Sequence, residues 1–227
     1  MTSSDSVGFR TVSGIDVSHR QGDVNWHSVA EAGISFAFAK ATEGGTFTDP
    51  QFNANWAGMN SAGILRGAYH FFRPARPFEA QVENFVKAVR ELKTGDLPPV
   101  LDLEEALTPN GDEWETIPIA QRVELVRSWL DAVEARLGRR PIVYTRRGFV
   151  TLELPNPAPL SQCSLWIAHY TNKLAPDLPS AWKTWTFWQY SDAGKVDGIV
   201  GHVDLDRFNG SQLDLSALTD TGISPSN

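Results

Sequence analysis

The chain has 227 residues, 41% of them hydrophobic and 21% charged, and its formal net charge is −7. This size suits one large domain or two small ones, and the composition is that of a globular protein. The acidic balance argues against a nucleic-acid partner, which needs a basic face. No apolar run approaches the roughly 18 residues of a membrane span, so we expect no membrane insertion. With Cys163 as the single cysteine, an internal disulfide is excluded.

The N-terminus shows no basic segment followed by an apolar one, which a secretory signal would contain. A signal could have been removed from the sequence, so localisation stays open, as does the biological role.

Short β-rich runs recur along the chain and alternate with helical patterns in its first half. Apolar residues at helical spacing predict helices over 49–62, 78–92 and 118–138, the first of them capped by Asp49. Strands that alternate with helices imply parallel pairing through crossover connections. The predicted strands cover residues 14–18, 34–42, 66–72, 98–104, 141–145, 165–170, 185–191 and 202–208.

Eight strands are the number that closes a small barrel. The later gaps, 146–163 and 171–184, are rich in Pro, Asn and Ser and contain no convincing long helix. We therefore predict an α/β fold, an irregular TIM-like (β/α) barrel with eight strands and fewer than eight helices; an open doubly wound sheet is the alternative. The barrel is expected to form a single domain over 13–210, after a flexible segment 1–12 and before a C-terminal cap and tail over 211–227.

The stretch "PVLDLEE" at 99–105 runs an apolar strand directly into three carboxylates. Residues two apart on a strand face the same side, roughly 6.5–7 Å apart, so Asp102 and Glu104 share a face, as do Asp204 and Asp206. Like charges this close on a partly desolvated rim raise at least one pKa. A carboxylic acid that is still protonated near neutral pH is what general-acid cleavage of a glycosidic bond requires.

Other polar and aromatic candidates also lie near predicted strand ends, where barrel enzymes place their chemistry. Structural roles remain open for several of them: Asp16 as a strand-end cap, Asp102 and Glu104 as solvated groups, His70 and His169 as packed core residues. No HxH, HExxH or GxSxG motif is present, so we expect neither a metal nor a cofactor. The candidates are Asp16, Glu43, Tyr69, His70, Asp102, Glu104, Tyr144, Trp166, His169, Trp188, Gln189, Asp204 and Asp206.

Six motifs in order give the chain a family resemblance over about residues 13–210. They are "GIDVSHRQG" (14–22), "FAKATEG" (38–44), "GAYHFFRP" (67–74), "PVLDLE" (99–104), "FWQYS" (187–191) and "VDLDRFNG" (203–210). Together they resemble glycoside hydrolase family 25, the Chalaropsis-type lysozymes or N-acetylmuramidases. The resemblance implies an irregular eight-stranded barrel that cleaves the β-1,4 bond between N-acetylmuramic acid and N-acetylglucosamine. Peptidoglycan glycan strands would then be its partner, and we expect it to act as a monomer.

The resemblance also implies roles for individual residues. Glu104 matches the family's general acid, Asp102 its companion carboxylate, and Asp16 and Asp204 two further acids; Tyr69 matches a tyrosine near the sugar's 2-acetamido group. One departure is Asp206, which stands where the family usually has Asn. It adds negative charge near the rim, unless a salt bridge to Arg207 or another base neutralises it. The other residues predicted to bind substrate are Glu43, His70, Tyr144, Trp166, Trp188, Gln189 and Asp206.

The sequence leaves the mechanism and the substrate partly open. Asp102 could orient the acetamido group so that its oxygen attacks the anomeric carbon, which gives net retention; alternatively, a carboxylate could activate water on the opposite face, which gives inversion. We favour the first. Two other functions also compete: a catalytically silent glycan-binding barrel, and a glycosidase that acts on chitin-like polymers.

Overall fold

The structure is a computed structural model that describes residues 11–220. Eight strands close into a barrel because β1 pairs with both β2 and β11, and this closure excludes the open sheet. The predicted barrel is therefore confirmed. In order around the barrel the strands are β1 (Thr11–Val17), β2 (Phe36–Glu43), β4 (Leu65–Phe71), β5 (Val100–Leu103), β8 (Ile142–Thr145), β9 (Leu165–Ala168), β10 (Phe187–Gly194) and β11 (Val203–Asn209).

The last strand runs against the direction that the sequence predicts. β11 is antiparallel to both of its neighbours, β1 and β10, whereas the other barrel strands pair in parallel. Only residues 195–202 separate β10 from β11, and a parallel crossover needs about a dozen residues or more. As a result, the beginning of β11 meets the carboxyl ends of the other strands, so that Asp204 lies opposite Asp16 at the rim.

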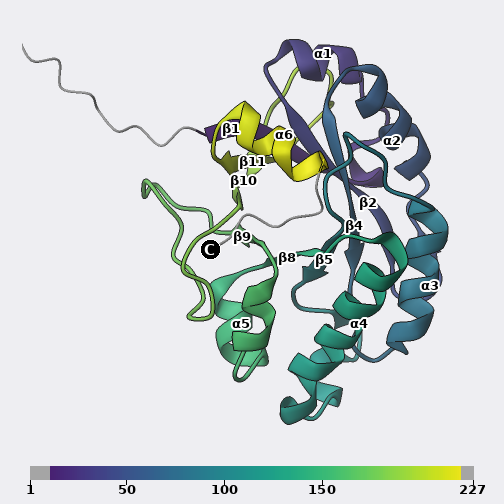
Figure 1. The fold of residues 1–227 in the computed structure, drawn as a ribbon, viewed down its shortest axis with the longest axis vertical. Helices are drawn as coiled ribbons and strands as arrows, with labels where there is room; N and C mark the ends of the chain where they lie inside the picture. The colour runs from purple at the N-terminus through teal and green to yellow at the C-terminus, as the bar shows by residue number, and fades with distance from the viewer. Residues whose placement is uncertain (1–10, 221–227) are drawn as a thin grey trace, which may run out of the picture.

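The helices cover the first half of the barrel, as predicted, while loops and short helices surround β8 to β10 (Figure 1). Helix α2 starts later than expected: Gln51 is its N-cap, and Asp49 accepts hydrogen bonds from the backbone N–H groups of Gln51 and His19. The α-helices are α1 (Trp26–Glu31), α2 (Phe52–Ser61), α3 (Phe78–Val89), α4 (Arg122–Leu137), α5 (Arg147–Glu153) and α6 (Gln212–Asp220). The remaining elements are β3 (Phe47–Thr48), β6 (Leu107–Thr108), β7 (Gly111–Asp112) and the 3₁₀ turns η1 (His19–Gln21), η2 (Glu113–Thr116), η3 (Ile119–Gln121) and η4 (Ala158–Gln162).

Two hydrophobic cores lie on the two faces of the barrel strands. The larger one packs strands against the surrounding helices, and it includes Leu101 and Leu103 of β5. The smaller one fills the barrel interior with aromatic rings: Phe38 stacks on Trp166 with centroids 4.5 Å apart. Leu215 of α6 joins this interior core. The lower part of the barrel is thus packed solid, as in other small barrels, and the space for a ligand lies above it.

The barrel begins slightly before the predicted boundary at residue 13. Thr11 and Val12 already pair with Asn209 and Phe208, so they belong to β1. Helix α6 stands where the C-terminal cap is predicted. Residues 1–10 of the segment 1–12 that is predicted to be flexible, and residues 221–227 of the predicted cap and tail over 211–227, lie outside the described residues. Within residues 11–220, the helices are all too short or too polar to cross a bilayer.

Candidate active site

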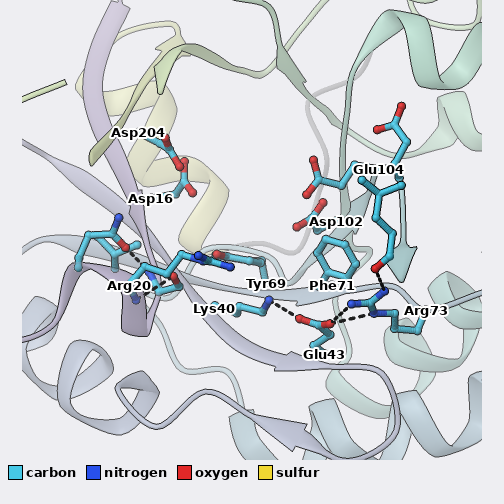
Figure 2. Close-up of a pocket in the computed structure, with 15 residues that line it drawn as sticks. Asp16, Arg20, Lys40, Glu43, Tyr69, Phe71, Arg73, Asp102, Glu104 and Asp204 are labelled. Carbon is cyan, nitrogen blue, oxygen red and sulfur yellow. Dashed lines mark hydrogen bonds and ion pairs between the residues drawn. The ribbon is translucent and has the colours of Figure 1, made fainter. Parts of the chain in front are cut away.

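A groove crosses the carboxyl-end rim of the barrel, above the aromatic interior (Figure 2). It consists of two adjoining cavities of about 360 and 250 Å³. The two cavities share five lining residues: Asp16, Tyr69, Asp102, Glu104 and Asp204. Asp16 and Asp204 lie on one side, and Asp102 and Glu104 lie on the other. The groove is therefore flanked by carboxylates on both sides.

The first side, which we call the β5 wall, consists of Asp102 and Glu104. Because Leu101 and Leu103 point outward to the helices, strand alternation turns both acids inward. Asp102 is 7% exposed, and its Oδ1 is buried without a hydrogen-bond partner. Burial raises the pKa of Asp102 well above its ordinary value, and the charge of Glu104 adds to this. Burial, followed by repulsion from Glu105, likewise raises the pKa of Glu104.

The opposite side, the β1–β11 wall, consists of Asp16, Asp204 and, beneath them, Asp206. Asp16 and Asp204 are direct partners across the antiparallel pair. Burial is the largest cause of the raised pKa of all three carboxyl groups, and it brings that of Asp204 to about 6. Repulsion from Asp206 and Asp204 raises the pKa of Asp16 further. Several of these groups therefore hold protons at a pH at which exposed aspartates have lost theirs.

Gln189 links this wall to the aromatic side of the groove. Its Oε1 accepts hydrogen bonds from the hydroxyls of Tyr144 (2.9 Å) and Tyr170 (2.8 Å). Its Nε2 donates to Asp16 Oδ2 at 2.7 Å. Because two phenols occupy the amide oxygen, the amide nitrogen must face Asp16. The side chain of Asp16 is thereby held in one orientation by a neutral donor.

A compact ion-pair cluster closes one end of the groove (Figure 2). Glu43 accepts hydrogen bonds from Lys40 Nζ (2.6 Å) and Arg73 Nε (2.8 Å). Burial would raise the pKa of Glu43, but the hydrogen bonds and charges of Lys40 and Arg73 outweigh it and lower the pKa. Lys40 also lies over the ring of Phe71, 4.9 Å from its centroid. This end is polar, and its charges are largely neutralised internally.

Residues 15–199 match the family described as Glycosyl hydrolases family 25. The chain belongs to this family. It is 41% identical to Lysozyme M1 of Streptomyces globisporus over 91% of this chain and 71% of that protein. It is 31% identical to the N,O-diacetylmuramidase of Chalaropsis sp, over 86% of this chain and 96% of the relative.

The fold agrees with this assignment. The crystal structure of the bacterial lysozyme from Streptomyces coelicolor superposes with a TM-score of 0.88 at 38% identity, and the match covers 93% of this chain and 98% of that one. The protein is therefore a glycoside hydrolase of family 25 with the eight-stranded barrel seen in a lysozyme. The match also confirms the family that the six sequence motifs suggest.

Two residues predicted at the groove of this family 25 barrel lie elsewhere. His70 is fully buried behind the barrel, where it hydrogen-bonds Thr42 Oγ1 (2.7 Å) and Gln81 Oε1 (3.0 Å). Burial lowers its pKa to about 4, so the ring is neutral near pH 7. Trp188 packs into the outer core, and its Nε1 donates to the carbonyl of His169. Alternation explains both cases, since the neighbours Tyr69 and Gln189 take the inward positions.

Asp206 also lies away from the groove surface. It is fully buried below Asp16, and its Oδ1 accepts a hydrogen bond from Trp166 Nε1 at 2.8 Å. The suggested salt bridge to Arg207 is wrong, because the guanidinium of Arg207 lies over the ring of Tyr190, 4.2 Å from its centroid. Adjacent residues on β11 face opposite sides, so Asp206 points into the barrel and Arg207 points out.

The structure brings the other predicted residues to the groove: Glu43 at one end, and Tyr144, Trp166 and Gln189 in the smaller cavity. The sequence reasoning missed several lining residues. Lys40 could have been found, because it follows the inward-facing Phe36 and Phe38 at the same strand spacing. The missed residues are Val17, Ser18, Arg20, Gln21, Lys40, Phe71, Arg73, Glu105, Leu107, Tyr170 and Asp192. Over residues 11–220, His, Cys, Asp and Glu side chains form no group of three or more suited to a metal ion.

Proposed function

We propose that the protein is a peptidoglycan hydrolase of the lysozyme type, a 1,4-β-N-acetylmuramidase. It would cleave the β-1,4 bond between N-acetylmuramic acid and N-acetylglucosamine. The observation that carries this proposal is the pair of acidic walls that face each other across an open groove in a family 25 barrel. The relatives named Lysozyme M1 and N,O-diacetylmuramidase support the choice of substrate.

In this proposal Glu104 is the general acid. Its side chain lies at the groove, and burial together with the charge of Glu105 raises its pKa, so that it keeps its proton to a higher pH than an exposed glutamate does. Glu104 is also less buried than Asp102, so it can recover a proton from solvent after each turnover. The indole of Trp114 donates to the Glu104 carbonyl oxygen at 2.9 Å and holds the backbone in place. These are the properties that protonation of a leaving sugar oxygen requires.

Asp102 would orient the substrate. Its carboxyl group lines both cavities and is suited to accept the N–H of a 2-acetamido group, and Tyr69 lines the same cavities. The acetamido oxygen then attacks the anomeric carbon while the bond to the leaving oxygen breaks and that oxygen takes the Glu104 proton. Water opens the cyclic intermediate and returns a proton to the Glu104 carboxylate. This route gives net retention of configuration.

The β1–β11 wall supports the competing route. Asp16 or Asp204 could activate a water molecule on the face of the sugar opposite Glu104, which would invert the anomeric centre. The first-formed anomer decides between the two routes, and it can be observed by proton NMR during the first turnovers. The β-anomer is expected. The α-anomer as first product would eliminate the substrate-assisted route.

The remaining contacts would bind the glycan. Tyr144, Trp166 and Gln189 line the cavity between the two walls, and Glu43 lies at the end of the adjoining one. Aromatic faces and fixed amides are typical of sugar sites, because they match the apolar faces and hydroxyls of pyranose rings. His70, Trp188 and Asp206 are not part of this binding surface.

Digestion of purified peptidoglycan tests the proposal, with mass spectrometry of the reducing ends of the fragments. A muramidase leaves reducing N-acetylmuramic acid. Reducing N-acetylglucosamine would identify a different glycosidase, and equal turnover of chitin oligomers would identify a broader one. Retention of the glycan without cleavage by folded protein would instead indicate a glycan-binding barrel.

A further inference from the structure

The groove continues past Glu104 into a third cavity of about 610 Å³, which we call the side cavity. It shares Glu104, Tyr144 and Tyr170 with the groove already described, so the two are continuous. Its outer part is lined by Arg146, Arg147, Leu152, His169 and Asp177. This surface extends away from the two acidic walls and is larger than either cavity between them.

The side cavity combines cationic and apolar groups. Leu152 is 70% exposed and Tyr170 is 51% exposed, although both are large apolar side chains. Arg146 pairs with Glu105, and Asp177 pairs with Lys173 at 2.6 Å. Arg147 is exposed, and none of the ion pairs found within residues 11–220 includes it. The charge of Arg147 also lowers the pKa of Asp177, although the two side chains form no ion pair. The surface therefore offers a guanidinium outside any ion pair beside apolar side chains, in a protein whose net charge is −7.

We infer that the side cavity binds the acidic peptide stem of peptidoglycan. Arg147 contacts a stem carboxylate, and Leu152 and Tyr170 contact its apolar side chains. The inference rests on the proposed function, because the sugar whose anomeric carbon reacts is the one that carries the stem. The stem therefore starts next to Glu104, which the side cavity shares with the catalytic groove. An arginine is well suited to this role, since its guanidinium binds a carboxylate with two hydrogen bonds.

The opposite end of the groove is less suited to a peptide. Lys40 and Arg73 there are both held by Glu43, and the cavity is smaller. Arg20 is the exposed cation at that end, and it lies against the groove in Figure 2. Its replacement therefore serves as a test of the alternative placement.

The experiment compares two substrates, soluble peptidoglycan strands with their stems and the same strands after an amidase has removed them. Reducing-end release gives kcat and KM for each, and the measured quantity is the ratio of kcat/KM with stems to kcat/KM without them. We expect a ratio above one for the wild type. Arg147→Gln is expected to lower the ratio about three- to tenfold, mainly through KM, as for a charge-assisted contact on a partly exposed surface. Arg127→Gln, on the outer face of α4, is the matched control and keeps the wild-type ratio.

Several outcomes would overturn the inference. A wild-type ratio of one, or an unchanged ratio in Arg147→Gln, would show that the stem is not bound at this surface. An equal loss on both substrates would mean that Arg147 acts on the glycan and not on the stem. A loss confined to the stripped strands would mean that Arg147 binds the lactyl carboxylate, which is free only after the amidase has removed the stem. A loss of the ratio in Arg20→Gln alone would place the stem at the opposite end. Failure of the proposed function looks different, because the wild type would then release no reducing N-acetylmuramic acid from either substrate.

Discussion

The two walls of the groove hold the same kind of side chain in different electrostatic settings. On the β5 wall, Asp102 and Glu104 come from one strand, and the charge of Lys40 opposes the rise that burial causes in the pKa of each. On the β1–β11 wall, Asp16 lies opposite Asp204 across two strands. The side chains that stabilise charge there, Gln189 and Trp166, are neutral.

This difference indicates a division of roles. On the β5 wall, burial raises the pKa of the carboxyl group and a nearby cation lowers it. A carboxyl group in this setting that also lies at the open groove can release and recover a proton quickly. The carboxyl groups of the β1–β11 wall lie close together, and their hydrogen-bond donors carry no charge. Such a cluster favours a low net charge and keeps a fixed arrangement. We therefore expect the β5 wall to carry out proton transfer and the β1–β11 wall to position substrate or water.

Replacing the acid of the β5 wall is expected to have the largest effect. Glu104→Gln removes the transferable proton but keeps the shape, so kcat should fall by a factor of ~10² or more while KM changes little. Asp204→Asn on the other wall is expected to cost less. Reducing-end assays measure both, with Glu115→Gln, an exposed glutamate of η2, as the control. If Glu104→Gln turns over at nearly the wild-type rate, the assignment of the acid to the β5 wall is wrong.

The neutral donor of the β1–β11 wall provides the next test. Gln189→Leu leaves Asp16 without its donor and the hydroxyls of Tyr144 and Tyr170 without their acceptor. The free energy of unfolding should fall by about 1–3 kcal/mol, the cost of buried polar groups without partners. Urea unfolding measures this loss. Gln189→Glu keeps an acceptor for the two hydroxyls but places a second carboxyl group against Asp16, so its stability should fall further as pH rises and both groups ionise. Unchanged stability in Gln189→Leu would show that Gln189 does not hold this wall.

The pH dependence of stability should also reveal the β1–β11 wall. The folded pKa of Asp204 is about 6, against an ordinary value of 3.8, so between about pH 4 and pH 6 the unfolded chain loses this proton while the folded protein keeps it. The free energy of unfolding therefore falls as pH rises through this window. The raised pKa values of Asp16, Asp102 and Asp206 act with the same sign.

Asp204→Asn removes one part of that decline, so its stability should depend less steeply on pH than that of the wild type. Urea unfolding at several pH values across the window measures the two slopes. Glu43, with its lowered pKa, contributes the opposite slope, but only below its ordinary value of 4.5. A wild-type stability that rises through the window would contradict the protonated state inferred for this wall.

The smallest effect is expected at the buried carboxyl group below the wall. Asp206→Asn keeps an acceptor for the indole of Trp166. It also puts a neutral amide in place of the carboxyl group whose charge raises the pKa of Asp16. The limb of the pH–activity profile that depends on Asp16 should move to lower pH, and stability near neutral pH should rise by up to about 1 kcal/mol. Asp197→Asn, an exposed aspartate between β10 and β11, is the control. A profile that matches the wild type would mean that Asp206 does not act on Asp16.

Local sequence patterns were sufficient for much of this protein. All eight barrel strands, and the helices that cover the first half, follow from apolar runs and helical spacing, because these depend on neighbouring residues. The shared face of Asp102 and Glu104 follows in the same way from the two-residue period of a strand. The short hairpin β6–β7 has no comparable signal, since two-residue strands have no measurable period.

Only the tertiary structure decided which face of each strand points into the barrel. Both faces of these strands are buried, so the apolar pattern does not distinguish Tyr69 from His70, or Gln189 from Trp188. The direction of β11 depends on barrel closure, and it is this direction that places Asp204 beside Asp16. The contact between Gln189 and Asp16 joins residues 173 positions apart. No local pattern encodes such a contact, because it exists only once the barrel has closed.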